Sequence, residues 1–168
     1  MRKLFLLNLC VFFVFIFSSC GGNSVVSPVT NFSATMQVQW DDVDITGDFS
    51  NTYQGVMTFS VSKPDTLNGF KYVYKDNELE MFFENLKCNT TSDYLPKDNY
   101  LNRLYACLNE LGRVEKLDYE NINNTQNCYT INTDDREYEI YINSKTGLIE
   151  KIESENFTFT FSNQKEFT

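Results

Sequence analysis

The stretch that decides the fold is NFSATMQVQW, residues 31–40, in which apolar side chains occupy every second position. Successive side chains of a β-strand point to opposite faces, so a period of two predicts a strand with one buried face and one wet face. The apolar positions are Phe32, Ala34, Met36, Val38 and Trp40, and the positions between them hold Ser, Thr and Gln.

The same alternation recurs on both sides of one interruption. It predicts strands over 57–61, 70–74 and 79–83, and again over 128–133, 137–142, 148–153 and 156–162. Residues that tolerate turn geometry stand between them at Gln54-Gly55, Asp76-Asn77 and Lys145-Thr146-Gly147, and Pro64 should end a strand because it lacks a backbone donor. About eight short antiparallel strands follow from this pattern.

The interruption has the spacing of a helix. Apolar residues three and four positions apart form one stripe between Pro96 and Gly112, with Asp98 as the expected N-cap and Gly112 as the expected C-cap. Cys107 falls at the edge of this stripe and should behave as a small buried hydrophobe. The stripe consists of Tyr100, Leu101, Leu104, Tyr105, Leu108 and Leu111.

A sheet with one apolar face must bury that face against another layer. We therefore predict a mainly β (α+β) domain over residues 31–168: a curved antiparallel sheet that forms an incomplete β-barrel, with the one amphipathic helix on its concave side.

The N-terminus has the three parts of an export signal over residues 1–19: a basic start at Arg2-Lys3, an apolar run, and the small pair Ser18-Ser19 before Cys20. The run Leu4–Phe17 is shorter than the roughly 20 residues that a membrane-spanning helix needs, so a retained transmembrane anchor is the weaker interpretation. An ordinary cleaved signal that happens to precede a cysteine is a further alternative. Residues 20–30 are then predicted to form a flexible tether, or alternatively the irregular start of the first strand.

Removal of the signal leaves 12 basic against 23 acidic residues and a formal charge of −11. Nucleic acids and anionic membrane surfaces are bound by clustered Lys and Arg. We therefore expect no nucleic-acid partner and a domain that stands off the membrane.

Three stretches carry a resemblance to a known family: NFSATMQVQW (31–40), GVMTFSVSKPDTLNGFKYVY (55–74) and EIYINSKTGLIEKIESENFTFTFSN (139–163). Over most of residues 31–163 the chain resembles the outer-membrane lipoprotein-carrier (LolA/LolB-like) half-barrels, including small clostridial-type bacterial lipoproteins. SSCGG around Cys20 likewise resembles a lipobox, which implies that Cys20 receives a lipid. The resemblance implies a cup whose apolar interior holds acyl chains, or a surface that binds a protein.

Nine apolar side chains on alternating positions are the candidates for lining such a cup. The alternative is that they are ordinary core, because one face of any half-buried sheet is apolar and close packing fills it. The nine are Phe32, Met36, Trp40, Met57, Phe59, Phe70, Tyr72, Met81 and Phe83.

An enzyme is the weaker interpretation. The sequence contains no histidine, the residue most used for acid–base work near neutral pH. Asp41, Asp42, Asp44, Asp134 and Asp135 could supply carboxylates, but they fall in predicted loops and lack the spacing of a calcium-binding loop. We expect no catalytic residue, no metal and no cofactor.

Three cysteines remain after Cys10 and Cys20 are set aside: Cys88, Cys107 and Cys128. At most one internal disulfide can form, and no C-x-x-C spacing indicates a zinc site. The sequence leaves their disulfide state open.

Two functions remain. The first is a lipid-anchored carrier on the outer face of the bacterial cytoplasmic membrane that binds an acyl chain or lipid. The second is a structural or regulatory lipoprotein that docks a cell-envelope protein, such as a cell-wall or spore-cortex hydrolase.

Overall fold

The computed structural model describes residues 26–76, 78–91, 94–96, 99–114, 119–133 and 136–167. The predicted export signal and Cys20 lie outside these residues. No helix within the described ranges is long and apolar enough to cross a membrane.

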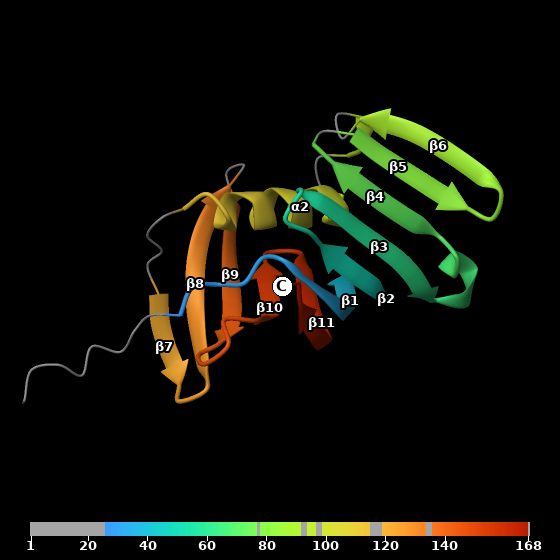
Figure 1. The fold of residues 1–168 in the computed structure, drawn as a ribbon. Coiled ribbons are helices and arrows are strands. Elements are labelled where there is room, and N and C mark those ends of the chain that lie inside the picture. Colours follow the sequence, from blue (N-terminus) through green and yellow to red (C-terminus); the bar gives the residue numbers. More distant parts are fainter. Residues whose placement is uncertain are drawn as a thin grey trace, which may run out of the picture.

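The described chain is one open antiparallel sheet with a helix packed on its inner face (Figure 1). The order of strands is β6-β5-β4-β3-β2-β1-β11-β10-β9-β8-β7, so the first and last strands of the domain pair at its centre and β6 and β7 are the edges. The strands are β1 Phe32–Trp40, β2 Val43–Asn51, β3 Val56–Lys63, β4 Lys71–Lys75, β5 Glu78–Phe83, β6 Leu86–Thr91, β7 Tyr119–Asn123, β8 Gln126–Thr133, β9 Arg136–Asn143, β10 Ile149–Ser154 and β11 Phe157–Glu166. The helices are the short η1 Asp65–Leu67 and α2 Tyr100–Leu111.

The predicted fold class is confirmed, but the described sheet has three strands that the alternation did not reveal. In β2, Gly47 and Asn51 occupy buried positions where the pattern needs apolar side chains. The other two, β6 and β7, are edge strands with mostly polar side chains. Asp44 therefore lies in a strand and not in the predicted loop, whereas Asp41 and Asp42 do form the β1–β2 turn.

Gly47 is required by close approach of the next strand. A Cβ at this position would collide with the backbone carbonyl of Ser60 and the ring of Phe59. The residue that weakened the strand signal is thus the one that lets β2 and β3 pack.

The N-cap of α2 lies one residue later than predicted. Asn99, and not Asp98, is the N-cap: its side-chain oxygen accepts from the backbone N–H of Leu101 at 2.9 Å and of Asn102 at 3.4 Å. Gly112 is the C-cap, as predicted, and Cys107 is completely buried, as predicted.

The core lies between α2 and the inner face of the sheet. Strand register places Val38 between Ile45 of β2 and Phe159 of β11. Beside them the rings of Phe32, Phe49 and Phe161 contact one another with centroids 5.3 to 5.5 Å apart. The centre of the half-barrel is therefore filled by protein side chains.

Candidate functional site: an aromatic wall at the open end of the half-barrel

The nine predicted lining residues separate into two groups in the structure. Phe32, Met36, Met57 and Phe59 are 0–1% exposed and belong to the packed core. Trp40, Phe70, Tyr72, Met81 and Phe83 are only half-buried. A ligand could reach the first group only if the core opened, so the second group is where an apolar ligand can bind.

Four of the half-buried side chains form a continuous surface on β4 and β5, which we call the aromatic wall: Phe70, Tyr72, Met81 and Phe83. Tyr72 pairs directly with Met81 across the two strands. The ring of Phe70 stacks on Phe83 with centroids 4.3 Å apart and on Tyr72 with centroids 6.2 Å apart. Because Phe70 and Phe83 are each two residues from that cross-strand pair, all four side chains share one face.

The inner border of the wall is polar and is supplied by the first turn of α2. The hydroxyls of Tyr72 and Tyr100 share a hydrogen bond, and burial is the larger influence that raises the pKa of both groups. Next to them the Tyr74 hydroxyl donates to Asn102 Oδ1. Burial also raises the pKa of Tyr74, whose side chain is buried like that of Tyr100, so the hydroxyl of half-buried Tyr72 is the one of the three that a ligand can reach. Trp40 reaches the same border, its ring centroid 6.1 Å from that of Tyr100.

The outer border of the wall is the edge strand β6. Register places Cys88 beside Met81 and Leu86 beside Phe83. Both border residues face solvent, and Leu86 is 72% exposed. The wall is therefore closed by α2 on one side and accessible along the other.

No charged side chain lies on this face of β4, β5 or β6. The charged residues of these strands, such as Lys71, Glu80 and Lys87, occupy the alternate positions and point to the opposite face. An uncharged apolar surface with hydroxyls along one border is suited to an amphipathic ligand, since the rings contact its apolar part and the hydroxyls its polar part.

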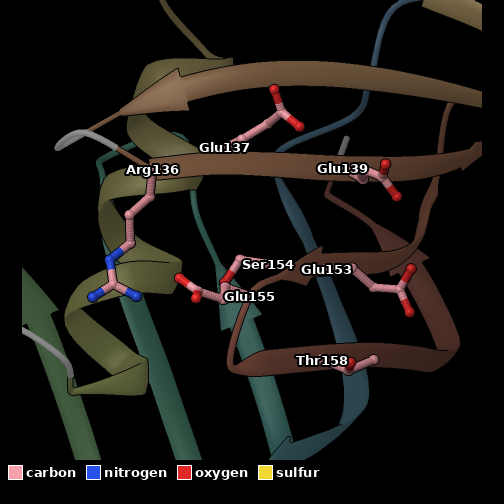
Figure 2. A pocket seen from close by; sticks show the side chains of 7 residues that line it. All are labelled: Arg136, Glu137, Glu139, Glu153, Ser154, Glu155 and Thr158. Atoms are coloured by element: carbon pink, nitrogen blue, oxygen red, sulfur yellow. The ribbon is translucent and has the colours of Figure 1, made fainter.

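A separate depression of about 480 Å³ lies on the other half of the sheet, at β9, β10 and β11 (Figure 2). It is polar, and none of the nine predicted residues contributes to it. Within the described ranges no group of three or more acidic or cysteine residues is placed to hold a metal ion. We therefore assign the candidate site to the aromatic wall. The residues lining the depression are Arg136, Glu137, Glu139, Glu153, Ser154, Glu155 and Thr158.

The remaining sequence candidates do not join this site. Cys107 and Cys128 are buried free thiols and Cys88 is an exposed one, so the structure pairs none of the three. Asp41 and Asp42 are exposed in the β1–β2 turn, and Asp44 is exposed in β2. Asp134 and Asp135 lie outside the described residues.

Sequence reasoning missed two features of the site, the Tyr100 and Tyr74 hydroxyls. The helical stripe included Tyr100 and the strand pattern included Tyr74, but periodicity reports only that a ring faces inward. An excess of tyrosine over phenylalanine at such positions is the one signal that could have indicated a polar border.

No protein-family model and no curated protein matches this chain. Among solved structures, an uncharacterised conserved protein from Thermus thermophilus superposes with a TM-score of 0.54 at 11% identity, covering 83% of this chain and 80% of that one. A LolA superfamily protein from Nitrosomonas europaea has a TM-score of 0.45 at 9% identity, with 87% and 90% covered. A putative outer membrane lipoprotein-sorting protein domain from Vibrio parahaemolyticus has a TM-score of 0.43 at 9% identity, with 84% and 88% covered.

The fold of this chain is similar to that of the Thermus thermophilus protein. At such low identity the likeness concerns the path of the chain alone. The role of this half-barrel must therefore be argued from its own surface.

Proposed function

We propose that this chain is a membrane-anchored extracytoplasmic lipoprotein that serves as a non-catalytic binding or carrier module for an apolar ligand, an acyl chain or lipid. The observation that carries the proposal is the aromatic wall, an uncharged apolar surface left half-exposed on the inner face of a sheet whose centre is fully packed.

An acyl chain fits this surface better than a compact ligand does. The wall is an exposed strip along two strands, and the stacked rings of Phe70 and Phe83 offer a flat face to a flexible chain. Each methylene that leaves water contributes about 0.8 kcal/mol, so about ten methylenes must leave water to supply the roughly 8 kcal/mol of micromolar binding, which is a length that a long acyl chain offers. The hydroxyl of half-buried Tyr72 would then contact the polar end of the ligand.

The anchor in this proposal is Cys20, exposed by cleavage after Ser19 and modified with fatty chains such as palmitate. The support comes from the three-part signal and the small residues around the cysteine. Such an anchor holds the module on the outer face of the cytoplasmic membrane, within the cell envelope.

Binding can be measured with a fluorescent polyene fatty acid, whose emission rises when its chain leaves water. Wild-type protein should bind it saturably, and palmitate should displace it. Emission that rises in proportion to protein without saturating, or that palmitate leaves unchanged, would contradict an acyl-binding wall.

Docking of a cell-envelope protein is the second candidate function, and the free edge of β6 favours it. This strand has a neighbour on one side only, and an edge strand can pair with an extended segment of another chain. A photoreactive group attached to Cys88 in intact source cells should then crosslink one specific envelope protein. Crosslinks only to abundant bystanders would count against docking at this edge.

A further inference from the structure

The second half of the predicted tether is not free but is docked on the sheet. The Tyr129 hydroxyl donates to the Val26 carbonyl at 2.8 Å, and the Val29 backbone N–H donates to the Gly147 carbonyl at 2.8 Å. Val29 also forms an isolated parallel bridge with Leu148. Figure 1 shows this segment in blue, running across β8 and β9 toward β1. The N-terminal chain therefore enters the domain at the β9–β10 turn.

The β9–β10 turn is joined to its neighbour, the β7–β8 turn. Ser144 donates through its backbone N–H to the Thr125 carbonyl at 2.9 Å and through Oγ to the Asn124 carbonyl at 3.1 Å. We call the two turns together, residues 123–126 and 143–147, the docked rim. It is one connected surface and not two independent loops.

The docked rim contains no acidic residue. The whole chain has a net charge of −9, yet no acidic residue occurs in 121–133 or in 140–149. The rim carries one charged side chain, the exposed Lys145. The nearest carboxylate on β10, Glu150, is half-buried and accepts hydrogen bonds from Gln126 and Asn143 at 2.9 and 3.2 Å.

From these observations we propose that the docked rim faces the surface of the membrane that anchors the chain. The inference rests on the proposed lipidation of Cys20. Only six residue steps separate Cys20 from Val26, a reach of at most about 20 Å. Anionic headgroups repel an acidic protein surface and attract Lys, so the rim, which joins the N-terminal segment and carries Lys145 without an acidic residue, can approach them.

This orientation has a consequence for the aromatic wall. The wall lies on β4 and β5, near the β6 edge, whereas the rim belongs to strands at the β7 edge. The anchor thus holds one end of the half-barrel at the bilayer and presents the binding surface from the other end.

The orientation can be tested with the full lipidated chain in anionic phosphatidylglycerol vesicles that contain nitroxide-headgroup lipid. One fluorophore is placed on native Cys88 near the wall, and another, in a second sample, on the rim in a Thr125→Cys, Cys88→Ser chain. The other two described cysteines are buried and should not react. We expect quenching of the rim fluorophore to exceed that of the Cys88 fluorophore by at least about twofold.

Equal quenching at the two sites, or stronger quenching at Cys88, would overturn the orientation while leaving the anchor intact. A chain that does not stay on the vesicles would overturn the proposed anchor and this inference with it. Lys145→Glu should lower the ratio of the quenching at the rim to the quenching at Cys88. The matched variant Lys75→Glu, on an exposed position of β4, should leave it unchanged. An equal effect of both variants would contradict a specific role of the rim.

Discussion

Phe70 and Phe83 stack with their ring centroids 4.3 Å apart and their planes only 17° from parallel. One ring directly precedes β4 and the other ends β5, and both remain half-buried. A stack of this kind on the inner face of a half-barrel gives the apolar surface a flat, continuous shape, which is what an extended acyl chain needs.

The first prediction concerns this stack. Phe83→Ser should weaken binding of the polyene fatty acid by about tenfold, because part of the contact of one ring with the chain is lost. Phe82→Ser is the matched control, since Phe82 is the neighbouring residue on the opposite face, where Lys87 lies over its ring. Fluorescence titration measures both. An equal loss in the two variants would place binding elsewhere.

The second prediction concerns Gly147, whose φ is +74°. Gly147→Ala adds the strain of a left-handed conformation and a collision with the Ser27 carbonyl, so we expect a loss of about 1–3 kcal/mol in the free energy of unfolding. Gly55→Ala has the same strain at φ +68° but no atom within 4 Å of the new methyl group. Urea titrations should show the larger loss for Gly147→Ala. Equal losses would mean that docking of residues 26–30 contributes nothing.

The third prediction concerns the thiols. Cys88 is exposed, whereas burial raises the pKa of Cys107 and of Cys128. Because the thiolate is the reactive form, iodoacetamide should modify Cys88 faster than the other two by at least about two orders of magnitude in the folded protein. Peptide mapping against time measures the rates. Similar rates in the folded state, before any urea is added, would contradict the described packing.

The fourth prediction concerns alkaline pH. Burial raises the pKa of Tyr72, Tyr74 and Tyr100 above the value of about 10 that tyrosine has in an unfolded chain. Because their pKa is raised in the folded state, the protonated tyrosines stabilise the folded protein. This contribution is complete below about pH 10 and is lost as the pH rises from there toward the folded-state pKa. The free energy of unfolding should therefore fall above about pH 10.

Tyr100→Phe should make this alkaline loss shallower. Tyr94→Phe, at a side chain that is 83% exposed, is the control and should leave the pH dependence as it is in the wild type. Urea titrations on either side of the tyrosine pKa provide the measurement. A wild-type stability that is flat across this range would show that the hydroxyls are not buried as described.

The sequence predicted the architecture because apolar and polar residues alternate in β1 and in the seven other predicted strands. It failed for β2, where Gly47 is required by the close approach of β3, a contact that alternation within one strand does not report. It failed for β6 and β7, which are edge strands. An edge strand pairs through its backbone with one neighbour and can do so without alternating apolar side chains.

The site could be predicted only in part for a related reason. A period of two places Met57 and Met81 on the same face but does not report how deeply each is covered. That depends on which elements pack over each position: Met57 is 1% exposed, whereas Met81 is half-buried. Docking of residues 26–30 left no signal at all, since it uses backbone carbonyls and a glycine.

The central claim is that the wall holds a lipid that is not covalently attached. The most direct test compares the native and the denatured mass of the mature chain purified from its source cells. We expect an acyl-bearing mass that leaves on denaturation, in addition to the fatty chains that stay on Cys20. Identical native and denatured masses in wild-type protein would contradict it.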